Sequence, residues 1–252
     1  MNLFLSAVFL SQSRTAYSAY VNDGTLRAPV EEDLTKRALS PATYHWEIIG
    51  GNINGEIGSR LGDGVSLNYN GSRVAVGAIR GGGDPTIGGE GEVKVFERSE
   101  NDQWVQLGED IAGEDDGERS GQSVSLSGSG NRVAVGAPFN NEIGSYQGQV
   151  RVYDYVNGSW IQYGEDLNGE DSFNDFGAKV HLSRDGMRLI VGAEGADGIN
   201  GLSSGHARVF ADSNGSWVQI GQDLDGECLL MNLSCHSLTN CSTSIAYSYY
   251  YL

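Results

Sequence analysis

The sequence predicts an all-β protein built from repeated units of four antiparallel strands, and three observations support this. Four tryptophans, Trp46, Trp104, Trp160 and Trp217, follow one another at spacings of 58, 56 and 57 residues. Each opens a similar phrase: WEIIGGNINGE, WVQLGEDIAGE, WIQYGEDLNGE and WVQIGQDLDGE. The composition, with 37 glycines and only 19% charged residues, favours short strands and many turns. A fixed period of this length indicates repeated supersecondary units.

The first predicted strand of each unit starts at a recurring glycine. Gly62, Gly121 and Gly177 each begin the pattern G-x-x-V-x-L, in which alternate positions are apolar. This alternation predicts a strand with one apolar face. A short turn follows in each unit, with the sequences NYNGS, SGSGN and SRDGM.

The second predicted strand is apolar on both faces. Residues 73–78 and 132–137 both read RVAVGA, and residues 188–193 read RLIVGA. A strand of this kind is typical of a sheet interior that is covered on both sides. We therefore expect one valine of each run to be buried between neighbouring units, namely Val76, Val135 and Val191.

The third and fourth strands complete the unit. A loop of about a dozen residues leads to Gly91, Gly148 and Gly205, which start the apolar runs EVKVF, QVRVY and HARVF. A tight turn then precedes each tryptophan, and two of these turns read Asn-Gly-Ser, a strong hairpin signal. The tryptophan phrase supplies the fourth strand.

Repeated units of four antiparallel strands are the blades of a β-propeller. Residues 46–226 contain three complete blades and an extra strand that opens at Trp46. Because propellers close with about four to eight blades, the sequence predicts an incomplete ring. The open faces of such a ring would be apolar, so we expect self-association of the chain when it is expressed alone.

Two short motifs resemble the FG-GAP repeat. Phe176-Gly177 begins one unit, and Gly136-Ala137-Pro138 ends the second strand of another. The other units depart from the pattern, with Leu61 and Ser120 in place of Phe, and Ile79 and Glu194 in place of Pro. The resemblance implies the seven-bladed propeller of integrin α subunits and of many secreted proteins, and with it a binding role.

The resemblance also implies calcium binding. FG-GAP repeats often carry a calcium loop between their first two strands, but here that connection is only the five-residue turn. Such a turn supplies fewer oxygens than the six to eight that calcium takes. If calcium binds, we expect it instead at the acidic loops that precede the glycines, with the ligands Asp115, Asp116, Asp171 and Asp175. No other cofactor is predicted.

Carboxylates also recur in phase after each tryptophan. One set is Glu56, Glu114, Glu170 and Glu227, and another is Asp110, Asp166 and Asp223. A residue that repeats in every blade could satisfy the same turn in every blade, or the carboxylates could contribute to metal sites. Both interpretations remain open at the level of sequence.

The segments outside the repeats suggest secretion. Residues 1–18 contain an apolar stretch and small residues before a suitable cleavage point, so they are interpreted as a signal peptide, although no Lys or Arg precedes the stretch. Residues 19–45 are a polar linker or pro-segment. Residues 227–252 form a divergent tail that holds all three cysteines, and after Glu227 it carries no charged side chain. This break is typical of a frameshift or a retained intron. We expect a secreted or cell-surface protein.

The net charge and the absence of common motifs argue against several classes of function. The formal charge of −17 argues against nucleic-acid binding, and no apolar run is long enough for membrane insertion as a helix. No common catalytic motif is present in the sequence. The leading hypothesis is a non-catalytic propeller, not an enzyme, that binds a protein or carbohydrate ligand. The alternatives are a fragment of a propeller enzyme, a lyase or glycan hydrolase, or a non-functional truncated product.

The candidate binding residues lie in the loops between second and third strands, which differ from one repeat to the next. Variable loops on a rigid scaffold are common recognition sites. Aromatic side chains there could stack on a sugar or pack at the rim. The candidates are Asp84, Phe139, Asn140, Tyr146, Asp197 and Asn200.

Three asparagines are candidate glycosylation sites at turn tips. Asn70, Asn157 and Asn214 each begin an N-x-[ST] sequence. Such sites carry glycans in secreted eukaryotic proteins. The same Asn-Gly-Ser sequences also make good turns without any glycan, so both readings stay open.

Overall fold

The computed structural model describes residues 48–82, 89–197, 201 and 203–226 in full, and in the first 47 residues only the backbone of five short strands. The chain divides into two compact units, residues 1–48 and 49–252. In the first unit, β1 (Val8–Leu10), β2 (Ala16–Ser18) and β5 (Val30–Glu32) form one antiparallel sheet, and β3 (Val21–Asn22) pairs with β4 (Thr25–Leu26).

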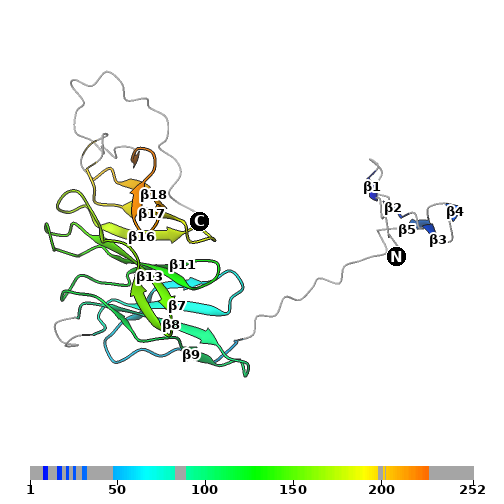
Figure 1. Ribbon diagram of the computed structural model, residues 1–252, viewed down its shortest axis with the longest axis horizontal. Helices are drawn as coiled ribbons and strands as arrows, with labels where there is room; N and C mark the ends of the chain where they lie inside the picture. The colour runs from blue at the N-terminus through cyan, green and yellow to red at the C-terminus, as the bar shows by residue number, and fades with distance from the viewer. Residues whose placement is uncertain are drawn as a thin grey trace, which may run out of the picture. The chain divides into compact units, whose positions relative to one another are not determined.

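The second unit contains three antiparallel sheets that stack in chain order (Figure 1). Blade 1 contains β6 (Leu61–Leu67), β7 (Arg73–Ala78), β8 (Glu92–Arg98), β9 (Trp104–Gln106) and β10 (Ile111–Ala112). Blade 2 contains β11 (Ser123–Leu126), β12 (Arg132–Ala137), β13 (Gln149–Val156), β14 (Ser159–Gln162) and β15 (Leu167–Asn168). Blade 3 contains β16 (Phe176–Leu182), β17 (Arg188–Ala193), β18 (His206–Asp212), β19 (Trp217–Gln219) and β20 (Leu224–Asp225). The described residues contain no helix, so none that could span a membrane. The predicted propeller architecture is confirmed, and its ring is unclosed.

The fourth strand of every blade is broken into two short pieces that both pair with the third strand. In blade 1, Gln106 pairs with Phe96, but Ile111 pairs with Val93, so the outer strand carries extra residues. Gly108 turns the chain there with a φ of 79°. A side-chain hydrogen bond then closes the bulge. In each blade a glutamine Nε2 donates this bond to an aspartate Oδ1. The pairs are Gln106 and Asp110 (2.7 Å), Gln162 and Asp166 (2.6 Å), and Gln219 and Asp223 (2.7 Å). The recurring aspartates therefore have a structural role.

The apolar core lies between the blades. We call the side of a blade that packs on the next blade its forward face, and the opposite side its rear face. Between blades 1 and 2, Ala75, Val93, Val95 and Ile111 pack against Val124, Leu126, Val133 and Val135. A second cluster between blades 2 and 3 is centred on Phe176, Leu189 and Val191. Val135 and Val191 are buried between blades, as predicted, whereas Val76 is buried on the rear face of blade 1 and belongs to neither inter-blade cluster.

Glycines let neighbouring blades approach closely. A Cβ atom added to Gly77 would lie 1.9 Å from the carbonyl oxygen of Gly121, and one added to Gly136 would lie 2.1 Å from that of Gly177. Serine hydroxyls strengthen the same contact, because Ser66 Oγ accepts a hydrogen bond from Leu126 N and Ser125 Oγ accepts one from Leu182 N. The in-phase glycines of the sequence are therefore interface residues.

The tryptophans tie the outer strands together. Trp160 Nε1 donates to the carbonyl oxygen of Leu107 in the preceding blade (2.8 Å), and Trp104 Nε1 donates in the same way to Ile49 (3.1 Å). Ile49 is the in-phase counterpart of Leu107. Residues 48–60 form no strand. Ile49 and Gly50 nevertheless contact Trp104 as the fourth strand of a preceding blade would. Trp46 itself lies outside the described residues.

Candidate functional site

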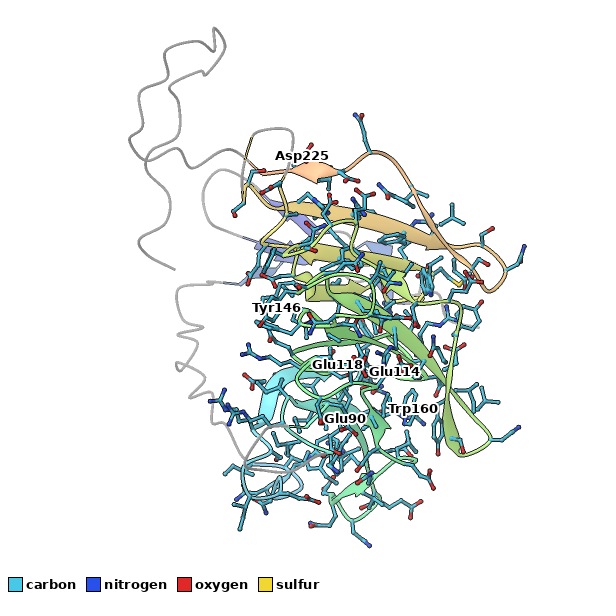
Figure 2. All side chains as sticks on the ribbon, turned by 90° about the vertical axis from the view of Figure 1, so that its left-hand side faces the viewer. Glu90, Glu114, Glu118, Tyr146, Trp160 and Asp225 are labelled. Carbon is cyan, nitrogen blue, oxygen red and sulfur yellow. The ribbon has the colours of Figure 1, made fainter. Side chains whose placement is uncertain are left out.

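One end of the blades gathers most of the candidate residues. The loops from second to third strands and the connections from one blade to the next lie at this end, since Gly113 N donates to Gly91 O and Gly169 N donates to Gly148 O. We call it the loop end. Figure 2 labels Tyr146, Glu114 and Glu118, which all belong to it. The turns at Asn70, Asn157 and Asn214 lie at the opposite end of their strands, and all three asparagines are exposed.

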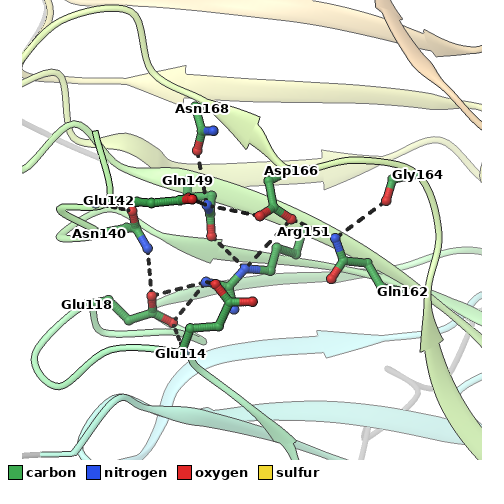
Figure 3. A network of polar contacts seen from close by, with 10 residues as sticks. All are labelled: Glu114, Glu118, Asn140, Glu142, Gln149, Arg151, Gln162, Gly164, Asp166 and Asn168. Carbon is green, nitrogen blue, oxygen red and sulfur yellow. Dashed lines mark hydrogen bonds and ion pairs between the residues drawn. The ribbon is translucent and has the colours of Figure 1, made fainter. Parts of the chain in front are cut away.

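A buried ion pair lies in the polar network of the loop end (Figure 3). Arg151 on β13 is 3% exposed, and its Nη2 lies 3.1 Å from Oε2 of Glu118, which is 1% exposed. Glu118 also accepts hydrogen bonds from Asn140 Nδ2 (2.7 Å) and from the backbone nitrogen of Glu114 (3.0 Å). Burial lowers the pKa of Arg151, but the charge of Glu118, the interaction with Tyr153 and the charge of Glu114 together outweigh this, so the pKa is raised and the guanidinium stays charged.

The same network reaches across the blade boundary. Arg151 Nη2 also contacts Glu114 Oε2 (3.3 Å), which comes from the end of blade 1. In blade 3, Arg208 repeats this arrangement with Glu170 (2.6 Å), which comes from the end of blade 2. The in-phase glutamates Glu114 and Glu170 therefore join successive blades through ion pairs.

An aromatic row adjoins this network, since Phe139 N donates a hydrogen bond to Glu118 O (3.2 Å). The rings of Phe139 and Tyr146 meet edge to face at 5.1 Å, and Tyr146 lies 5.8 Å from Phe173. The guanidinium of Arg119 lies 3.8 Å from the centre of the Phe139 ring. Tyr146 is 41% exposed and Phe173 is 61% exposed. Phe139 and Tyr146 thus pack on each other, while Tyr146 and Phe173 also present ring surface to solvent.

The backbone of the row is unusual. Tyr146 and Phe173 have positive φ angles of 52° and 64°. This region is uncommon for residues other than glycine and especially unfavourable for bulky side chains. Backbone hydrogen bonds hold it, because Phe173 N donates to Ser145 O (2.7 Å) and Asp175 N donates to Tyr146 O (3.1 Å). Strained residues of this kind cluster at functional sites.

Phe173 occupies a position at which the other repeats have glycine. Its in-phase counterparts are Gly58 and Gly117, which both have a φ of 86°. Blade 3 therefore places an exposed aromatic ring where the other two blades use glycine. The three positions each lie four residues before the aligned glycines Gly62, Gly121 and Gly177, so the sequence shows this substitution, but the positive φ of the two glycines comes only from the structure. Sequence reasoning missed Phe173, Arg119, Glu118 and Arg151.

The predicted metal ligands lie at the same end without forming a cluster. Asp115, Asp116 and Asp171 are exposed, and Asp175 is partly buried. Burial raises the pKa of Asp175, and the nearby charge of Glu194 raises it further. Within the ranges that the structure describes, no group of three or more His, Cys, Asp or Glu side chains is arranged to hold a metal ion. Calcium binding at these residues stays a prediction.

The remaining binding candidates have different positions. Asn140 is buried and belongs to the Glu118 network, so it supports the loop end and does not face a ligand. Asp197 is exposed, and its Oδ1 accepts a hydrogen bond from Ser203 N (2.7 Å). Asp84 and Asn200 lie outside the described residues. Of the predicted residues, only Phe139 and Tyr146 come together.

Comparisons with known proteins leave the family of this chain open. No protein-family profile matches it, and no curated protein does. Among solved structures, a Kuenenia stuttgartiensis hydrazine synthase aligns with 13% identity and a TM-score of 0.42, over 71% of this chain and 41% of that one. A tricorn protease aligns with 12% identity and a TM-score of 0.37, over 65% and 17%. This chain thus matches less than half of either protein, and similarity at this level carries no argument about activity or ligand.

Proposed function

We propose that this chain is a non-catalytic binding module of the FG-GAP kind, which recognises a protein or carbohydrate ligand at the loop end. The observation that carries the proposal is the aromatic row of Phe139, Tyr146 and Phe173. Exposed aromatic rings on a rigid support contribute large contact area with little loss of conformational entropy. Their planar faces suit stacking on a sugar ring, and tyrosine is enriched at the energetic centres of protein interfaces.

The surroundings of the row fit recognition and not catalysis. Three charged groups near the row are engaged, because Arg119 stacks on Phe139, and Glu118 and Arg151 form a buried ion pair. The ion pair and the Asn140 hydrogen bond hold the loops in place, so little ordering is needed when a ligand binds. Preorganised contacts of this kind raise affinity.

Secretion and glycosylation belong to the same proposal. The exposed asparagines Asn70, Asn157 and Asn214 would carry glycans at the far end of the blades, away from the aromatic row. A protein at the cell surface or outside the cell could then be glycosylated without covering its binding end. Adhesion is the role that this arrangement suits.

Phe173→Gly is the decisive variant, because glycine is what the other blades have at this position. It relieves the positive φ, so the melting temperature should stay the same or rise, while binding should weaken at least tenfold. Wild type and variant are compared on a glycan array and against a panel of immobilised extracellular proteins, and each hit is measured by calorimetry. Asn157→Gln, at the far end, is the matched control and should bind as wild type does.

Two results would contradict the proposal. One is a hit whose affinity Phe173→Gly and Tyr146→Ala leave unchanged, since binding would then lie elsewhere. The other is turnover of a bound glycan by the wild-type chain, which would favour the alternative of a propeller enzyme.

A further inference from the structure

The two outer faces of the three-blade stack are the two halves of one interface. Every internal interface joins a forward face to a rear face through the same in-phase contacts. Blade 3 ends the described stack with an open forward face, and blade 1 begins it with a rear face on which Val65 and Leu67 are exposed although Val76 is buried. We infer that a second copy of this chain docks head to tail, its blade 1 on blade 3 of the first copy.

The forward face of blade 3 carries the same arginine and glycine as the forward faces of blades 1 and 2, but no described blade packs on it. Gly192 is the counterpart of Gly77 and Gly136, yet a Cβ added to it would meet nothing closer than 3.6 Å. Arg73 Nη1 and Arg132 Nη1 each donate to a turn carbonyl of the next blade, Gly130 (3.3 Å) and Gly186 (2.9 Å). Their counterpart Arg188 is exposed and makes no such bond among the described residues.

The rear face of blade 1 complements it. Val65 and Leu67 are 65% and 61% exposed, whereas their counterparts Val124 and Leu126 are buried against the preceding blade. A Cβ added to Gly121 or Gly177 would lie 3.0 or 3.3 Å from the glycine of the preceding blade, but one added to Gly62 would meet nothing within 4 Å. Gly192 of one copy therefore matches Gly62 of a second copy in the register of the internal interfaces.

The structure describes three blades in each copy. Propellers close with about four to eight blades, so two copies joined through these faces would bring together six described blades, a number that can close a ring. The interface is heterologous, and a ring of two copies closes it at both ends.

The outer strands must exchange when the second copy docks. Gly50, Gly108 and Gly164 each lie against the indole of the following tryptophan, but a Cβ added to their counterpart Gly221 would meet nothing within 4 Å. In the docked pair, Ile220 and Gly221 of the first copy take the position against Trp104 that Ile49 and Gly50 of the second copy hold now. Docking therefore moves Ile49 and Gly50 away from Trp104.

Two variants test the pairing of faces. Gly192→Val adds a side chain to the forward face, where the single chain has room for it, and valine is favoured in strands. Val65→Asp places a charge on the exposed rear face. Each variant alone has one blocked face and should be a monomer in light scattering at micromolar concentration, while wild type has twice the chain mass. Ser216→Val, on an exposed turn outside both faces, is the control and should remain a dimer.

Mixing the two variants gives the sharpest result. Gly192→Val keeps an intact rear face and Val65→Asp keeps an intact forward face, so an equimolar mixture should form a dimer and nothing larger. Monomeric wild type, single variants that still dimerise, or a mixture that stays monomeric would each overturn the inference. An unfolded Gly192→Val variant would overturn it too, because the forward face would then not be open.

Discussion

Glu118→Gln tests whether the buried ion pair holds the loop end. The variant keeps the shape of the side chain but removes the charge that faces Arg151 at 3.1 Å and puts an amide donor beside Asn140 Nδ2 or Glu114 N. Removing one partner of a buried ion pair costs about 3–5 kcal/mol. Because Arg151 retains Glu114 at 3.3 Å, we expect a loss of about 3 kcal/mol, at the low end of that range.

The loss is measured by urea unfolding and by calorimetry. For a folded unit of this size it corresponds to a fall in melting temperature of roughly 6–12 °C. Asp102→Asn is the control, since Asp102 forms an exposed pair with Arg98 at 3.6 Å, and its loss should cost less than about 1 kcal/mol. Combining Glu118→Leu with Arg151→Met should cost less than Glu118→Gln, because no buried charge is left alone. A Glu118→Gln variant within about 0.5 kcal/mol of wild type would refute the reasoning.

Three further predictions concern pH, the tryptophans and calcium. Burial raises the pKa of Asp212, but hydrogen bonds from Gly215 N, Arg132 and Tyr163 outweigh this and hold the pKa below its usual range. The carboxylate therefore stabilises the fold above the unfolded pKa of about 3.9, and this stabilisation is lost as the pH falls through the folded pKa. Asp212→Asn should thus lower the melting temperature at pH 7 more than under strongly acidic conditions. Equal shifts of the melting temperature under both conditions would contradict the prediction. Trp160→Phe loses the hydrogen bond to Leu107 O, whereas Trp217 Nε1 has no acceptor within the described part of the chain, so Trp160→Phe should cost about 1 kcal/mol more than Trp217→Phe in urea unfolding. Calcium bound by the acidic loops would raise the melting temperature with its free concentration, and an unchanged melt in millimolar calcium and in chelator would remove that prediction. The residues concerned there are Asp115, Asp116, Asp171 and Asp175.

The sequence was sufficient for the blades because their signals are local and repeat. The run RVAVGA marks β7 and β12 to the residue, since apolar side chains on both faces and a glycine at a fixed place leave little freedom of register. The Asn-Gly turns are also confirmed, with positive φ at Asn157 and Gly158. Three copies of each pattern made the phase unambiguous.

The other features of the fold and the site could not be predicted, because they depend on contacts between residues that no local sequence pattern indicates. The break in the fourth strand needs the pairing of Gln106 with Asp110, which only the folded bulge brings together. The Glu118–Arg151 pair joins residues 33 positions apart, one in the connection between β10 and β11 and the other on β13. Phe173 was missed because its meaning lies in what the other blades have at the same place, a glycine with positive φ.

The central claim is that the blades meet through in-phase glycines and that the last of these glycines faces outward. The most direct test is to compare Gly136→Ala with Gly192→Ala, both in the Val65→Asp background so that only the single chain is measured by urea unfolding. Gly136→Ala should lose about 1–3 kcal/mol, because its Cβ would overlap the Gly177 carbonyl oxygen. Gly192→Ala should lose nothing, or gain about 0.5–1 kcal/mol as alanine replaces glycine in a strand. Equal losses at both positions, or no loss at Gly136, would contradict the account.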